Sequence, residues 1–347
     1  MTNNDGASHH PSASMKDSVT YVAFSMGWKI VRRLPERRAY RLFERFADRL
    51  WARRGGGVLQ LERNLKRVVP EATDQQLREM SKESMRRYFR YWCDAFRMPD
   101  WSPERIVDTV EVVDEHHLRD AYEQGHGVVV ALAHSGNYDQ LGAWAVLTLG
   151  PLTSVAERLK PEKLFEKFLE YRRSIGLRIY PLGEPGLMDT LVHKDLREEH
   201  HIVALVSDRD LTAHGVPVMF FGELTRMPAG PASLALRSGA PLHAAVLWYD
   251  GPKSMAKIYP PIPVPESAPT GDGVRDKPGY KEAVASMTQA YANYLEEGIR
   301  EHPMDWHMMQ KLWLSDLDQV RLAASDAKAA AQTAADAAAV AVAEGRA

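Results

Sequence analysis

The spacing of hydrophobic positions changes near residue 110. Before that point apolar side chains recur every three or four residues, which predicts amphipathic helices. After it, short runs of β-branched and aliphatic residues alternate with helical stretches, which is typical of a layered sheet with helices outside. The unbroken apolar run from Val128 to Ala133 indicates a strand that is buried on both faces. The pattern therefore predicts an α/β fold whose central, mostly parallel sheet is flanked by helices.

Further elements follow from the same pattern. We expect strands at 177–180, 202–206 and 242–249, a helix beginning near Tyr138, and a long helix over 281–300. Since strands and helices alternate along the chain, the connections between parallel strands are expected to run through helices.

Two basic amphipathic helices are predicted at the N-terminal side, separated by Pro35. Between Trp28 and Arg54 there are ten Lys or Arg residues and three Asp or Glu residues, a surplus of seven positive charges. Tyr40 and Trp51 are interleaved with these charges. Helices of this kind favour an anionic membrane interface, although an ordinary surface helix remains an alternative.

Composition divides the chain into four parts. Residues 1–15 are polar and predicted to be disordered. Residues 16–57 hold the basic helices, which we expect to dock on a membrane, and residues 58–315 hold the α/β domain. Residues 316–347 form an Ala-rich, low-complexity tail to which we assign no chemistry.

Charge and cysteine content exclude several classes of protein. The net charge of -2 gives no general attraction to nucleic acid. A single cysteine, Cys93, cannot form an internal disulfide, so a reducing compartment fits best, and a buried apolar role is expected. There is no apolar run long enough to span a membrane and no secretory signal. The histidines lack metal-ligand spacing, so no metal or cofactor is expected.

The most informative segment follows the buried strand and contains His134 and Asp139. The carboxyl ends of strands in such sheets usually carry ligand sites. Gly136 permits a tight turn, after which Asp139 falls in the first turn of the next helix. We expect the turn to bring His134 back to Asp139, so that the carboxylate orients the imidazole as a general base. A capping or core histidine is the alternative.

The segment from His134 to Asp139 resembles the HxGNxD/E signature of the lysophospholipid and lipid A acyltransferase family. Three further blocks match in the same order: Glu157-Arg158 with Arg172-Arg173, then Asp208-Arg209 with Phe220-Phe221-Gly222, and finally Asn293 to Trp306. The chain has Asp139 where the family often has Glu, and it has basic helices in place of a membrane-spanning helix. It is therefore most similar to the phosphatidylinositol mannoside acyltransferases of actinobacteria.

This resemblance implies an activity and a set of residues. A palmitoyl-type group moves from acyl-coenzyme A to a mannose 6-hydroxyl of a mannosylated phosphatidylinositol, at the cytoplasmic face of the cell membrane, to which the protein binds peripherally. His134 is implied as the general base and Asp139 as its orienting carboxylate. Five of the other matched residues are implied in substrate binding: Glu157, Arg158, Arg172, Asp208 and Arg209.

Other functions stay open on the residues alone. A serine hydrolase is disfavoured because no G-x-S-x-G segment is present. A lipid carrier without catalytic activity, or a transferase acting on another glycolipid, fits the same pattern. The oligomeric state, the preferred chain length and the group that stabilises the oxyanion do not follow from the sequence.

Overall fold

The computed structural model describes residues 26–158, 162–210, 212, 214–320, 322–324, 326–328 and 331. The predicted disorder of residues 1–15 and the start of the first basic helix lie outside the described residues, as does most of the Ala-rich tail.

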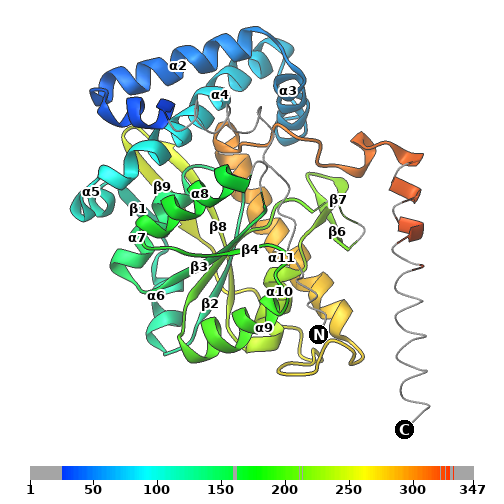
Figure 1. Ribbon diagram of the computed structural model, residues 1–347. Coiled ribbons are helices and arrows are strands. Elements are labelled where there is room, and N and C mark those ends of the chain that lie inside the picture. The colour runs from blue at the N-terminus through cyan, green and yellow to red at the C-terminus, as the bar shows by residue number, and fades with distance from the viewer. Residues whose placement is uncertain are drawn as a thin grey trace, which may run out of the picture.

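Within this described part, seven strands form one sheet in the order β1-β9-β8-β2-β5-β3-β4 (Figure 1). Neighbouring strands are parallel except β8 and β9, which are antiparallel. This confirms the predicted α/β fold with its mostly parallel sheet. The bounds are β1 (Val110–Val113), β2 (Val128–Leu132), β3 (Leu152–Ala156), β4 (Arg178–Pro181), β5 (Ile202–Val206), β8 (Leu242–Asp250) and β9 (Lys253–Ile258).

The strands expected from apolar runs are present as β2, β4, β5 and β8, each within a residue or two of the predicted bounds. Strands β3 and β9 had not been predicted, because Ser154 and the two lysines of β9 interrupt their apolar runs. A separate antiparallel hairpin of β6 (Val216–Phe220) and β7 (Glu223–Met227) was also not predicted.

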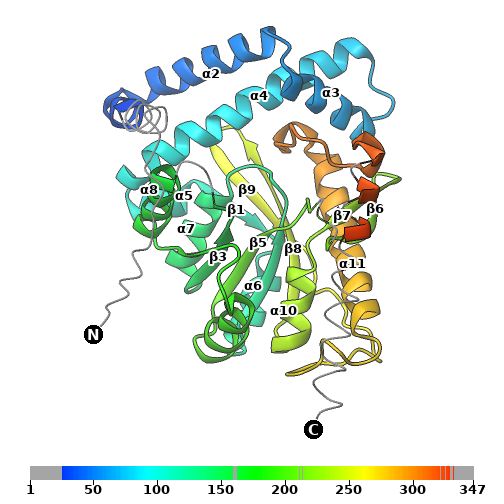
Figure 2. The same cartoon turned by 45° about the vertical axis from the view of Figure 1, so that its right-hand side comes forward.

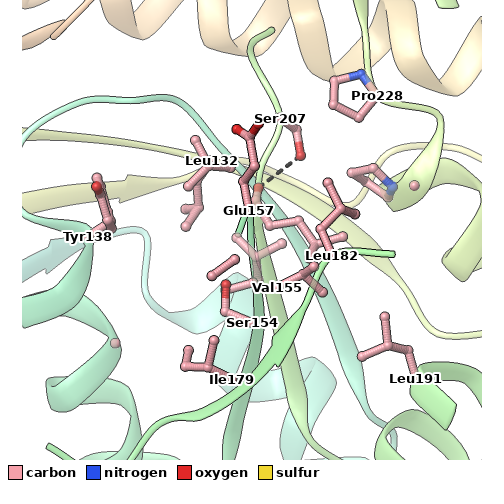
Figure 3. A pocket seen from close by; sticks show the side chains of 18 of the residues that line it. Leu132, Tyr138, Ser154, Val155, Glu157, Ile179, Leu182, Leu191, Ser207 and Pro228 are labelled. Atoms are coloured by element: carbon pink, nitrogen blue, oxygen red, sulfur yellow. Dashed lines mark hydrogen bonds between the residues drawn. The ribbon is translucent and has the colours of Figure 1, made fainter. Parts of the chain in front are cut away.

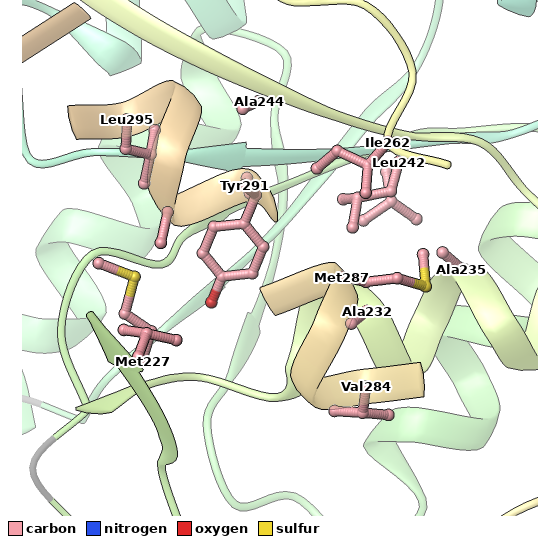
Figure 4. Close-up of a cluster of buried hydrophobic side chains, with 14 of the residues drawn as sticks. Met227, Ala232, Ala235, Leu242, Ala244, Ile262, Val284, Met287, Tyr291 and Leu295 are labelled. Atoms are coloured by element: carbon pink, nitrogen blue, oxygen red, sulfur yellow. The ribbon is translucent and has the colours of Figure 1, made fainter. Parts of the chain in front are cut away.

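Helices cover both faces of the sheet, and β2 is accordingly apolar and buried at every position. Val128, Val130 and Leu132 face one core, while Val129 and Ala131 face the other. The first core is covered by α6 (His116–Glu123), α7 (Tyr138–Thr148) and α8 (Glu162–Ser174). The second is covered by α9 (Leu187–Asp189), the π-helix Thr190–Glu198, α10 (Gly230–Ser238) and α11 (Tyr280–Glu301). Figure 4 shows Met287 and Tyr291 of α11 among the aliphatic side chains of this second core.

The N-terminal helices form a layer at one end of the sheet (Figure 2). A helical segment over 26–33 precedes Pro35, which is followed by α2 (Glu36–Ala52), as predicted. Then come α3 (Gly56–Val68), α4 (Asp74–Arg97), a short 3₁₀ helix (Met98–Asp100) and α5 (Pro103–Asp108). Among the described helices, none combines the length and hydropathy that a membrane crossing requires.

Helix α4 connects this layer to the sheet. Arg90 donates hydrogen bonds to the backbone carbonyls of Gly251 and Pro252, 2.7 and 3.0 Å away, just beyond the end of β8. Asp94 accepts a hydrogen bond of 3.2 Å from the hydroxyl of Tyr249. These contacts fix α4 across the carboxyl end of the sheet, where parallel α/β folds place their ligands.

Candidate active site

A tight turn presents His134 directly after β2. The turn requires glycine at position 136, because φ is +52° and a Cβ there would lie 2.7 Å from the backbone of Leu247. Asn137 then caps α7, and its side chain accepts a 3.0 Å hydrogen bond from the backbone N–H of Gln140. His134 therefore stands outside the helix, with 44% of its side chain exposed.

Asp208 is the carboxylate that contacts the ring of His134. Its Oδ1 lies 2.5 Å from His134 Nδ1, and its Oδ2 accepts the backbone N–H of the same residue at 3.0 Å. Asp208 follows β5, the neighbour of β2, so the ends of two parallel strands bring the residues together. Because a carboxylate only accepts hydrogen bonds, Nδ1 carries the proton, which leaves Nε2 able to take one.

The pair perturbs the pKa of both groups. Burial disfavours the imidazolium, but the charge of Asp208 and its hydrogen bond outweigh burial and raise the pKa of His134 above its ordinary value. Burial likewise disfavours the charged form of Asp208, yet His134 and the other donors lower the pKa of this carboxyl below its ordinary value. The carboxylate therefore remains ionised and the imidazole becomes a stronger base.

The structure corrects the predicted pairing of His134 with Asp139. Asp139 is buried and accepts hydrogen bonds from Tyr91 Oη and Arg172 Nε, both at 2.9 Å. Its side chain extends from the first turn of α7 toward α4 and α8, which supply these two partners, and both of its oxygens are engaged there. The orienting position at His134 is taken by Asp208 instead.

The other predicted residues lie in different surroundings. Arg172 lines the large cavity described below and is tied to Asp139, while Arg209 lines it and donates to the carbonyl of Lys311 at 3.1 Å. Glu157 is exposed at the rim of that cavity. Arg158 is exposed, pairs with Glu162 and does not line the cavity. Cys93 is buried, as expected, and burial raises the pKa of its thiol to about 12.

A C-terminal segment that sequence reasoning gave no role holds the His134 turn in place. Ser135 and Trp306 form an antiparallel β-bridge. The backbone N–H of Gly136 donates to the carbonyl of Asp305 at 3.1 Å, and that of His307 donates to the carbonyl of His134 at 2.7 Å. Trp306 and Asp305 belonged to a block with a family resemblance, but no local pattern indicated that they would pair with residues so far away in the chain.

Asp305 links this segment to α4. Its fully buried carboxylate forms an ion pair with Arg87 of α4 and accepts the backbone N–H of Tyr249 at 3.1 Å. Burial raises the pKa of Asp305 to about 6, although Arg87 opposes this change. The turn that carries His134 is thus fixed both by the sheet and by the N-terminal layer.

A cavity of about 1200 Å³ opens beside His134 along the carboxyl end of the sheet. Figure 3 shows side chains of β2, β3 and β4 converging on it, among them Leu132, Val155 and Ile179. Its walls on the α7 and α8 side are mostly apolar and include Trp144 and Phe165, with Asp139 and Arg172 as the charged exceptions. A cavity that is large enough for a long hydrocarbon chain and apolar over much of its lining therefore reaches His134.

One described group has metal-like geometry away from this cavity. Potential ligand atoms of Asp195, Glu199 and His201 lie within 4.8 Å of one another, which the sequence had not predicted. Arg178 forms ion pairs with both carboxylates, at 2.6 and 2.5 Å. The guanidinium occupies an oxygen of each carboxylate and offsets one of their two negative charges, so this group has a structural explanation.

Comparison with known proteins identifies the family of this chain. Residues 8–315 match the model of the bacterial lipid A biosynthesis acyltransferases. A phosphatidylinositol mannoside acyltransferase of Mycolicibacterium smegmatis is 40% identical over 307 residues, covering 88% of this chain and 95% of the relative. Its counterpart in Mycobacterium tuberculosis strain CDC 1551 is 40% identical over 320 residues, covering 90% and 94%. The chain therefore belongs to the bacterial lipid A biosynthesis acyltransferase family.

Proposed function

We propose that this protein transfers a palmitoyl-type group from acyl-coenzyme A to a mannose 6-hydroxyl of a mannosylated phosphatidylinositol. The observation that carries the proposal is the His134–Asp208 pair at the mouth of an apolar cavity of about 1200 Å³. The names of the two relatives supply the class of acceptor. The cavity supplies room for the acyl chain, and the imidazole supplies the base that an alcohol nucleophile needs.

In the proposed reaction His134 Nε2 removes the proton as the mannose oxygen attacks the thioester carbonyl. The tetrahedral intermediate then collapses, its carbon–sulfur bond breaks, and the imidazolium returns the proton to the departing thiolate. Asp208 keeps the ring in one tautomer and stabilises its charged form. The thioester is already activated, so the protein forms no covalent intermediate. General base catalysis of this kind contributes about 10²–10⁴-fold.

Asp139 has a positioning role in this proposal. Through Arg172 and Tyr91 it joins α7 to α8 and α4 at the rim of the cavity. This fixes the wall beside the reacting carbonyl while leaving His134 free to respond to Asp208. The predicted participation of Asp139 in the site is retained, but as a residue that acts through its neighbours.

The proposed location is the cytoplasmic face of the cell membrane. Leu42 and Phe46, one helical turn apart on α2, are each 50% exposed, and Met26 and Ile30 are 59% and 56% exposed on the preceding helical segment. The exposed arginines of α2 surround this apolar surface. Such a surface partitions into the interface of an anionic bilayer and would hold the active site near a lipid acceptor.

A direct assay tests the proposal. The protein is incubated with radiolabelled palmitoyl-coenzyme A and purified phosphatidylinositol mannoside, and the acylated position of the product is determined by mass spectrometry. We expect a 6-O-acylated mannose and no product with His134→Ala, which should still bind the lipid. If His134→Ala and the native protein move label between lipids equally, the protein is a carrier. If another glycolipid is acylated much faster, the acceptor assignment is wrong.

A further inference from the structure

We infer that the charged end of the cavity, at Arg237 and Arg275, binds the phosphate groups of the acyl donor's nucleotide. The inference rests on the proposed function, because it concerns the coenzyme A thioester named there. The phosphates of the donor would then lie in an anion subsite remote from His134, while its acyl chain would occupy the apolar part of the cavity.

The cavity has two limbs of different character. One, which we call the apolar limb, lies against α6, α7 and α8 and is lined by Leu118, Trp144 and Phe165. The other, the charged limb, follows α9 and α10 on the opposite core of the protein and is lined by Asp189 and Arg237. His134 lines the same continuous cavity, so one long ligand can pass the base and occupy both limbs.

The charged limb extends well away from the base. Gly230 at the start of α10 and Arg237 near its end both line the cavity, so the cavity follows this helix for about 10 Å. A fatty acyl group joined to a long polar arm that ends in phosphates has this shape and polarity. Its chain fits the apolar limb, its thioester lies beside His134, and its phosphates reach the arginines.

Arg237 is built into the wall, since only 10% of its side chain is exposed. It pairs with Asp189 at 2.5 Å, but Asp189 is 66% exposed and lies at the rim. Arg275 lines the same limb, and both arginines lower the pKa of Asp189, with Arg237 making the largest contribution. A third arginine, Arg197, donates to the carbonyl of Arg237.

The local charge is suited to a phosphate. Arg197, Arg237 and Arg275 gather near two carboxylates, Asp189 and Asp272, of which Asp272 is held by Arg197 at 2.9 Å. Three guanidinium groups thus meet two exposed carboxylates. Guanidinium groups bind phosphate oxygens in bidentate fashion, and a phosphate can replace the exposed carboxylate of Asp189 on Arg237.

The phosphate could belong to the donor or to the phosphodiester of the lipid acceptor. The structure favours the donor, because α9 and α10 lie at the end of the molecule away from α2 and α4 (Figures 1 and 2). The exposed apolar residues proposed to touch the membrane are on and next to α2. A lipid acceptor enters from that side, whereas a water-soluble nucleotide can occupy the opposite end.

The test is a binding measurement that needs no turnover. Affinities of the full-length protein for decanoyl-coenzyme A and for decanoyl-pantetheine, which lacks every phosphate, are compared by calorimetry without acceptor. We expect Arg275→Glu and Arg237→Ala each to weaken binding of the coenzyme A thioester about tenfold or more. Binding of the pantetheine thioester should change less than about twofold.

Arg119→Glu is the matched control, because Arg119 is a surface arginine of α6 that does not line the cavity. If Arg237→Ala does not fold, Arg275→Glu decides, since its side chain is exposed. Equal losses for both thioesters, or no loss for either, would overturn the inference. The inference would also be overturned if the arginine variants lost binding only in flotation with phosphatidylinositol vesicles, because the arginines would then belong to the acceptor site. Failure of acyl transfer itself is detected separately in the turnover assay.

Discussion

Trp306 donates its indole N–H to Asp208 Oδ2 at 2.9 Å, and the other oxygen of the same carboxylate contacts the ring of His134. Trp306 is completely buried, and so is Asp208. The tryptophan therefore fixes the carboxylate that contacts His134. In the proposed mechanism Trp306 is a positioning residue, which acts on the base through Asp208.

Replacing this donor should alter the basicity of His134. In Trp306→Phe the carboxylate of Asp208 loses one of its hydrogen-bond donors. Its negative charge is then less stabilised and attracts the proton on His134 more strongly, so the pKa of His134 rises further. We expect kcat to fall about tenfold, in line with the loss of one hydrogen bond to a charged group. The acid limb of the kcat/KM profile should move to higher pH.

Trp313→Phe is the control for that substitution. Trp313 is equally buried, but its indole N–H donates to the carbonyl of Phe220 at 2.8 Å. It should lose stability without any shift of the acid limb. The positioning role of Trp306 would be contradicted if both variants gave the same pH profile.

The Arg87–Asp305 ion pair should make stability depend on pH. In the folded protein the pKa of Asp305 is about 6, above its ordinary value. Folding therefore favours the protonated carboxyl, and the resulting contribution to stability is lost as the pH rises through 6. Arg87→Met leaves the ionised carboxylate buried without its ion-pair partner, and only the hydrogen bond from the Tyr249 N–H remains. We expect a loss of about 3–5 kcal/mol at pH 8 in urea unfolding, and a smaller loss at pH 5.

Arg86→Met serves for comparison, because Arg86 pairs with Asp48 at a half-exposed position of the same helix. Such pairs contribute about 0–1 kcal/mol. A loss for Arg87→Met that is equally small, or that does not vary between pH 5 and pH 8, would show that the buried pair does not have the assigned role.

The apolar surface of α2 should determine membrane binding. Leu42→Ser with Phe46→Ser removes two half-exposed apolar side chains that we expect to enter the bilayer. Flotation with anionic vesicles should show an affinity loss of about tenfold or more. Leu147→Ser with Val264→Ser removes two side chains that are each 45% exposed elsewhere, and should bind normally. Equal losses in both double variants would count against docking through α2.

Depth of the apolar limb should set the preferred chain length. Ala145 is buried on α7 and lines the cavity, so Ala145→Phe fills part of the limb. Since each buried methylene contributes about 0.8 kcal/mol, the variant should lose activity with palmitoyl-coenzyme A and retain it with shorter donors. A uniform loss across donors from eight to sixteen carbons would place the chain elsewhere.

The fold was largely predictable from the sequence because its central strands are continuous apolar runs. The run at β2 gave both the buried strand and the position of His134 at its end. Asp208 was predicted as a site residue, but its partnership with His134 depends on β5 lying next to β2. Hydrophobic spacing predicts strands and does not specify their order in the sheet.

The predicted pairing of Asp139 with His134 was wrong for a physical reason. Proximity in sequence made it the apparent partner of His134, but the direction of its carboxylate is set by Arg172 and Tyr91 from two other helices. Trp306 is a similar case, since no local pattern shows that its indole will meet the carboxylate of Asp208, which follows β5. Pairings between distant segments require the three-dimensional structure.

The most direct test compares Asp208→Asn with Asp139→Asn in the pH dependence of kcat/KM. His134 has a pKa above the ordinary 6.5 because of Asp208, so the acid limb of the native protein should lie above that value. Asp208→Asn should lower kcat/KM about 10²-fold or more and move the limb to lower pH. Asp139→Asn should leave the limb in place. A limb that moves in Asp139→Asn and stays fixed in Asp208→Asn would contradict the assignment of Asp208 as the carboxylate that orients the base.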